Sequence, residues 1–126
     1  MKALNIIETA YRATLEEQDD TIVWLTHAIK GAGGELSVLL RGNAVNYAAK
    51  SQSVEPLSFG SRTQKNAPDI ARDVVGLIGK GVDVYIVSED LAERGLADGD
   101  LIDGLKPVAR GDLAGLFDGY DHVWHW

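Results

Sequence analysis

Three consecutive residues, Arg41, Gly42 and Asn43, follow an apolar run and combine features of a small-anion site. Arg41 supplies positive charge, and Gly42 lets a ligand approach the backbone closely. Asn43 opens a predicted helix with no acid in its first turn, and such a helix start attracts anions through its free N–H groups and dipole. Arg12, after an earlier apolar run, is a further candidate lining residue. The alternative is that Arg41 pairs with a neighbouring acid and Asn43 only caps the helix.

Ser88 joins the apolar run "DVYIV" to the acidic stretch "EDLAERGL" and is the other candidate for chemistry. A serine nucleophile needs an adjacent base and a group that orients the base. The histidines are His27, His122 and His125. None is placed by the sequence beside Ser88, and no G-x-S-x-G motif is present. We therefore interpret Ser88 as a helix N-cap and as a possible ligand-lining residue. A hydrolase or transferase using Ser88 with Glu8 or Asp90 is the remaining catalytic alternative.

The sequence favours neither a metal site nor a bound cofactor. His122 and His125 lie in a predicted strand, where residues three apart point to opposite faces and do not share one ion. The chain has no cysteine, which excludes a disulfide framework, a zinc ribbon and a thiol nucleophile. The glycine-rich motifs G-x-G-x-x-G and G-x-x-x-x-G-K-[ST] are also absent.

Composition predicts one acidic globular domain over residues 1–126. Hydrophobic residues make up 45% of the chain and charged residues 25%. Twelve basic against nineteen acidic residues give a net charge of −7, which disfavours nucleic acid and anionic membranes as partners. No apolar run approaches the roughly 20 residues that span a bilayer, and the first residues lack a secretory pattern. We expect a cytoplasmic protein.

Hydrophobic patterning predicts alternating strands and helices. The expected strands cover residues 3–8, 35–41, 83–88, 106–109 and 121–126. The expected helices cover residues 19–31, 43–50, 68–79, 89–96 and 111–120. Such alternation favours parallel pairing with helices on both faces, so we predict a single three-layer α/β/α domain with a five-stranded parallel sheet. Ligands of such sheets bind beyond the carboxyl ends of the strands. Residues 51–66 are predicted to be a long structureless loop with a functional or interface role.

Three stretches together resemble a known family. These are "VYIVSEDLAERGL", "VLLRGNAVNYAAK" and the closing "YDHVWHW". They resemble the DsrE/DsrF/DsrH family of small sulfur-relay proteins, which includes the TusB, TusC and TusD subunits. The acidic helix before Arg94-Gly95-Leu96 and the tryptophan-terminated last strand look most like the DsrH/TusB branch.

The resemblance implies a five-stranded parallel domain that works in trimers or hexamers, either with itself or with related subunits. Catalytic members carry a persulfide on a cysteine just after the third strand, and Ser88 stands at that position. A serine cannot form the sulfur–sulfur bond of a persulfide. The resemblance therefore implies a non-catalytic structural or regulatory subunit, assembled with itself or with cysteine-bearing relatives. A small-anion or small-ligand binding protein is the alternative.

Overall fold

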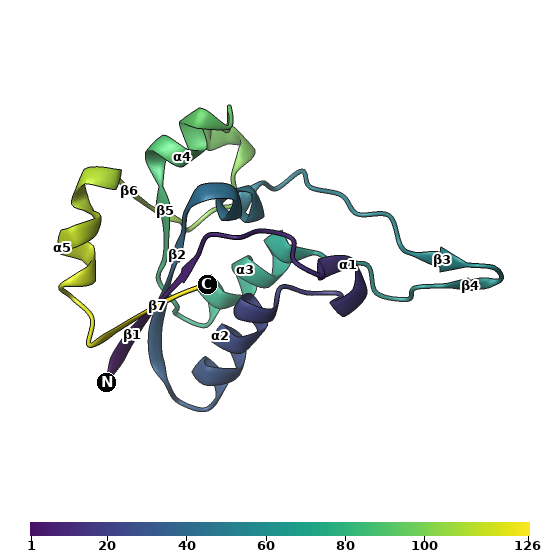
Figure 1. The fold of residues 1–126 in the computed structure, drawn as a ribbon, viewed down its shortest axis with the longest axis horizontal. Helices are drawn as coiled ribbons and strands as arrows, with labels where there is room; N and C mark the ends of the chain where they lie inside the picture. The colour runs from purple at the N-terminus through teal and green to yellow at the C-terminus, as the bar shows by residue number, and fades with distance from the viewer.

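The computed structural model describes residues 1–126 and contains a five-stranded, fully parallel sheet. The strand order is β6-β5-β2-β1-β7 (Figure 1). The strands are β1 (Lys2–Ile7), β2 (Glu35–Leu40), β5 (Val84–Val87), β6 (Lys106–Val108) and β7 (His122–His125). The predicted parallel α/β fold is confirmed, and all five strands lie where the apolar runs predicted them.

The centre of the sheet is apolar on both faces because β1 and β2 are covered on both sides. The two strands pair in parallel, from Lys2 opposite Glu35 to Ile7 opposite Leu40. Within them, only the first residue of each strand is not buried. A continuous apolar run without alternation is typical of a buried parallel strand.

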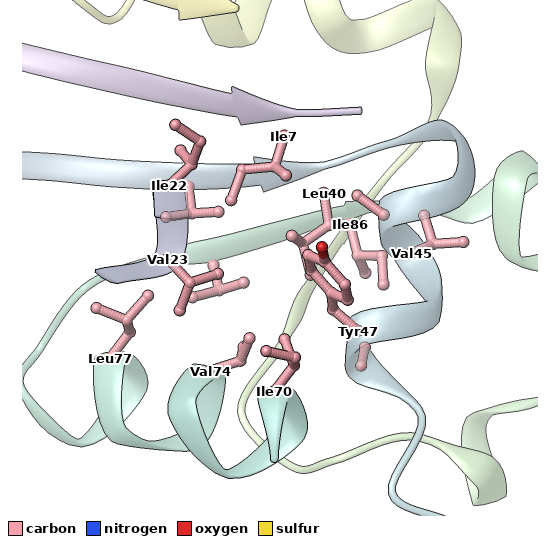
Figure 2. Close-up of a cluster of buried hydrophobic side chains, with 14 of the residues drawn as sticks. Ile7, Ile22, Val23, Leu40, Val45, Tyr47, Ile70, Val74, Leu77 and Ile86 are labelled. Atoms are coloured by element: carbon pink, nitrogen blue, oxygen red, sulfur yellow. The ribbon is translucent and has the colours of Figure 1, made fainter. Parts of the chain in front are cut away.

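The larger core lies between the sheet and a layer made of three helices. These are α2 (Thr21–Gly31), the 3-10 helix η1 (Gly42–Ala48) and α3 (Ile70–Gly79). Seventeen buried residues form this cluster, and Figure 2 shows the strand residues Ile7, Leu40 and Ile86 facing the helices. Asp69 caps α3 through the backbone N–H of Arg72. Ile70, Val74 and Leu77 form the buried face of α3, at the spacing that places residues on one side of a helix.

The opposite face of the sheet has a smaller core. Its five buried residues are Leu4, Ile6, Leu39, Val87 and Leu113. Leu113 begins α5 (Leu113–Phe117), which lies against this face after the short 3-10 helix η3 (Arg110–Asp112) (Figure 1). Helices therefore cover both faces of the sheet, as a three-layer domain requires.

Four predicted element boundaries or types are corrected by the structure. Residues 51–66 were expected to be structureless, but they carry an antiparallel hairpin of β3 (Ser58–Phe59) and β4 (Arg62–Thr63). A short helix, α1 (Thr14–Glu17), lies in the connection after β1. The predicted helix over 43–50 is a 3-10 helix that begins at Gly42. The helix predicted over 89–96 is α4 (Ser88–Glu93), which begins directly at Ser88 and is followed by the 3-10 turn η2 (Asp98–Asp100).

No helix of the structure has the length and apolar character needed to cross a membrane.

Candidate functional site

The carboxyl ends of the strands bring the predicted site loops together. Because β2 lies between β1 and β5, the loop after β2 adjoins the loops after both neighbours. The backbone N–H of Gly42 donates to Asp90 Oδ2 at 2.7 Å, and the N–H of Ala44 donates to the carbonyl of Glu8 at 3.2 Å. The structure therefore joins the loop after β2 to the start of α4 through Gly42 and to the end of β1 through Ala44.

A glycine is needed at position 42, between the end of β1 and the start of α4, for two reasons. Its φ of +55° is in the left-handed region, which favours glycine. A Cβ atom built there would also lie 3.1 Å from Cγ of Glu8. The predicted close approach at Gly42 is thus made by the protein's own Glu8 and Asp90.

The start of α4 forms a connected set of ionic hydrogen bonds, which we name the α4 corner. It comprises residues 88–94 together with Gly42, Asn43 and Arg110. Arg110 Nη2 contacts Asp90 Oδ1 at 2.5 Å and Glu93 Oε1 at 3.0 Å. The backbone N–H of Arg110 donates to Glu89 Oε2 at 2.8 Å. These bonds link α4 to the loop after β6.

Asp90 is the centre of the α4 corner. The residue is 6% exposed, and burial alone would raise its pKa. The hydrogen bonds from Gly42 and Arg110, with the charge of Arg110, outweigh burial and lower the pKa of Asp90 below its ordinary value. Asp90 is thus an anion built into the site, paired with a backbone donor and a guanidinium.

The side chains of Asn43 and Arg41 differ in whether they form hydrogen bonds within the protein. Asn43 was considered a helix cap, but its Oδ1 accepts from Arg94 Nη2 at 2.8 Å and η1 begins one residue earlier. Arg41 occupies the N-cap position without a side-chain cap bond. It forms no ion pair, and its Nε is buried without a hydrogen-bond partner in the protein. Arg41 is therefore the residue of this loop whose side chain has a buried N–H donor without an acceptor in the protein.

Ser88 is exposed at the junction of β5 and α4. It is the first residue of the helix rather than its N-cap, and no side-chain cap bond is formed there. The interpretation of Ser88 as an N-cap is therefore wrong. Ser88 forms no hydrogen bond to Glu8 or Asp90, whose carboxylates are bonded to other residues.

Arg12 lies on a different part of the same end of the sheet. It is exposed and borders a hollow of about 320 Å³ between the loop after β1, the start of α2 and the end of the chain. The hollow is lined by Arg12, Ala13, Glu17, Asp20, Thr21, Ile22 and Trp126. Arg41 does not line this hollow.

A buried tyrosine–aspartate pair was missed by the sequence analysis. Tyr47, fully buried in the larger core (Figure 2), donates from its hydroxyl to Asp20 Oδ2 at 2.6 Å and accepts from the N–H of Tyr11 at 2.7 Å. Burial is the main cause that raises the pKa of Tyr47, and the bond to Asp20 adds to it. The other oxygen of Asp20 caps α2 through Ile22 and Val23, as the predicted helix start required.

This pair anchors a segment with unusual backbone geometry. Tyr11, Ala13 and Gln18 all have positive φ, at 59°, 47° and 64°, although none is glycine. Such conformations persist only where surrounding structure holds them. The bond from Tyr11 to Tyr47 holds one end of the segment, and the α2 cap at Asp20 holds the other. Neither tyrosine carried a periodic signal that could have predicted this.

The terminal histidines are separated as predicted. His125 Nε2 lies 2.5 Å from Glu8 Oε2, whereas the ring of His122 stacks against Trp124 with a centroid distance of 6.3 Å. The structure contains no group of three or more His, Cys, Asp or Glu residues arranged to hold a metal ion. The Glu8–His125 pair was missed because it depends on β7 lying beside β1, which sequence order does not specify.

Comparisons with known proteins identify the fold and nothing finer. No protein-family model matches the chain, and no curated protein matches it. The YchN protein from E. coli superposes with a TM-score of 0.72 and 19% identity over 100% of both chains. MTH1491 from Methanobacterium thermoautotrophicum, described as of unknown function, gives a TM-score of 0.66 and 14% identity over 98% of this chain and 97% of its own.

A third similar structure is BT1422 from Bacteroides thetaiotaomicron, a conserved protein of unknown function. Its TM-score is 0.66 at 14% identity, covering 98% of this chain and 94% of that one. At these identities the likeness establishes a shared fold. That fold fits the DsrE-like architecture implied by the sequence resemblance.

Proposed function

We propose that this chain is a non-catalytic DsrE-like subunit, closest to the DsrH/TusB branch, with a structural or regulatory role in a sulfur-relay context. The observation that carries the proposal is Ser88. It lies exposed at the junction of β5 and α4, where the resemblance places the persulfide cysteine. With no cysteine anywhere in the chain, the protein binds and assembles but does not carry sulfur.

The partners under this proposal are other copies of the chain, in a trimer or hexamer, or related subunits that do carry the cysteine. Support comes from the likeness of fold and from aromatic side chains at the surface. Trp24 is 58% exposed, Phe59 is 75% exposed and Trp126 is 40% exposed. Large exposed aromatic residues are enriched at interfaces because they bury much area at little entropic cost.

Native mass spectrometry on protein purified gently from its own cells tests the proposal. We expect a homo-oligomer or a mixed assembly that contains cysteine-bearing proteins of the same fold. A protein that is monomeric at every micromolar concentration tested, and that recovers no related subunit, would contradict it.

A Ser88→Cys variant tests the identity of the junction. The expected result is that the new thiolate takes the sulfane sulfur of a small persulfide donor, which leaves as a thiol, and that the protein gains the mass of one sulfur atom. The control is Ser61→Cys, where the thiol is exposed but lies away from the strand–helix junction. Equal addition of sulfur at both positions would mean that the strand–helix junction does not favour persulfide formation.

Small-anion binding at Arg41 is the second candidate function. It is favoured by the buried Arg41 Nε, which has no partner in the protein although the neighbouring polar groups are paired. Thermal unfolding measured with sulfite, thiosulfate or phosphate should show stabilisation that is lost in Arg41→Ala and kept in the exposed control Arg72→Ala. Failure of every anion to stabilise the unmodified protein would exclude this function.

A further inference from the structure

Residues 51–66 form an arm that projects from the body of the protein. The chain leaves the domain after η1, reaches the β3–β4 hairpin and returns to α3, and the hairpin lies far from the sheet (Figure 1). The hairpin contacts the body beside β4, where Gln64 Nε2 donates to the carbonyl of Leu15 at 2.7 Å and a hollow of about 290 Å³ is bordered by Phe59, Arg62 and Glu16. The hairpin pairs only with itself. A two-stranded hairpin is at best marginally stable alone in water.

The tip of the arm presents an aromatic ring beside a positive charge. Phe59 pairs with Arg62 across the hairpin, so their side chains share one face. Ser58 and Thr63 pair on the other face, where their hydroxyl oxygens lie 3.0 Å apart. Phe59 is 75% exposed, and Arg62 forms no ion pair in its own chain. Aromatic and arginine side chains are the residues most often found at the energetic centre of an interface.

The charge of the arm is opposite to that of the body. Residues 51–66 contain Glu55, Arg62 and Lys65, which give the arm a net charge of +1. Because the whole chain has a net charge of −7, the remaining residues have a net charge of −8. The acidic body of another copy is therefore an electrostatically complementary partner for the arm. The same charges disfavour a strongly cationic partner.

A matching surface lies on the body between α2 and β7. An apolar groove of about 510 Å³ is lined by Leu25, Ile29, Val123, Trp124, His125 and Trp126. Strand β7 is at the edge of the sheet and pairs on one side only. Trp126 also borders the neighbouring hollow, which is lined by the exposed Glu17 and by Arg12. The body thus offers an apolar groove for Phe59, and Glu17 in the adjoining hollow is an acceptor for Arg62.

We propose that the arm of one copy docks on the α2–β7 groove of a second copy, with Phe59 in the groove and Arg62 near Glu17. The arm points away from its own β7, which excludes the same contact within one chain (Figure 1). Because the two surfaces differ, the contact is either exchanged reciprocally between two copies or repeated from copy to copy around a closed ring. This inference rests on the self-association proposed above and identifies the surfaces that produce it.

Sedimentation velocity over a concentration series gives the first test. Phe59→Ser should raise the dissociation constant of the assembly by at least about tenfold, as for an aromatic anchor at an interface centre. Phe59→Tyr keeps the ring and is the matched control, with a change of less than about threefold. Both substitutions are at an exposed position, so neither should prevent folding.

Cysteine pairing gives a geometric test because the chain contains no cysteine of its own. The Ser61→Cys protein places a thiol at the arm tip, and the Val123→Cys protein places one in the groove. Mixing the two under mild oxidation should give a disulfide-linked heterodimer in preference to either homodimer. Predominant linkage between two arm tips would overturn the proposed docking site.

A charge exchange tests the polar half of the contact. Arg62→Glu should weaken the assembly, and combining it with Glu17→Arg should restore most of the lost affinity. Assembly that survives Phe59→Ser and gives no arm-to-groove disulfide would overturn the arm contact but leave self-association intact. A protein that never assembles with itself would overturn both the arm contact and the proposed self-association. Binding of the arm to a different protein alone would count as this outcome.

Discussion

The α4 corner and the arm are both polar loop regions, yet they use their polar groups in opposite ways. In the α4 corner, Asp90, Arg94 and Arg110 are joined to one another or to the backbone of a neighbouring loop. In the arm, Glu55, Arg62 and Lys65 form no ion pairs, and Phe59 is mostly exposed. The corner therefore uses its charged groups within the fold, whereas the charged groups of the arm form no ion pair within the chain.

Removing the central acid of the α4 corner should produce the largest effect. Asp90→Ala should lower the free energy of unfolding by about 3 kcal/mol, because it leaves the Gly42 N–H and the Arg110 guanidinium without their partner. Urea denaturation measures the change. Asp118→Ala, at an exposed position, is the control and should change it by less than about 0.5 kcal/mol. A loss below about 1 kcal/mol for Asp90→Ala would show that the corner does not stabilise the fold.

The buried tyrosine beneath the loop after β1 should have the next largest effect. Tyr47→Phe removes the hydroxyl bonded to Asp20 and to the N–H of Tyr11, and should lower the free energy of unfolding by about 2 kcal/mol. Tyr11→Phe removes only an exposed bond to Gln52 and should cost about 0.5 kcal/mol. Equal effects in urea denaturation would mean that the buried pair does not anchor this loop.

Lowering the pH should remove the stabilisation that Asp90 gives to the folded state. The folded-state pKa of Asp90 is below its ordinary value of 3.8, so the unfolded state binds a proton first as the pH falls. The stabilisation from Asp90 is complete above that ordinary value and is lost as the pH falls through the folded-state pKa. Denaturation measured from neutral pH to strong acid should therefore show a shallower acid-induced loss in Asp90→Asn. An unchanged acid limb would contradict the assigned pKa shift.

The smallest effect on stability is expected at the arm. Phe59→Ser should change the free energy of unfolding by less than about 0.5 kcal/mol when it is measured at a concentration where the chain is monomeric. The same substitution should weaken self-association, which separates binding from folding. A large loss of monomer stability would mean that Phe59 packs within its own chain.

The local pattern of residues is sufficient to predict the class of fold and which residues form the strands of the sheet. Residues 84–87, for example, form a continuous apolar run, which is typical of a buried parallel strand. Asp20 before α2 and the apolar spacing in α3 likewise depend on neighbours in the chain. The absence of cysteine, which excludes a protein persulfide anywhere in the chain, is also a property of the sequence alone.

Which polar groups contact one another depends on the tertiary structure. Gly42 and Asp90 are 48 residues apart, and Glu8 and His125 are 117 apart. These pairs depend on the strand order, which places β2 between β1 and β5 and places β7 beside β1. Side-chain hydrogen bonds act over about 3 Å and leave no periodic trace in the sequence. The arm was missed for a related reason, because its two-residue strands are too short to show alternation.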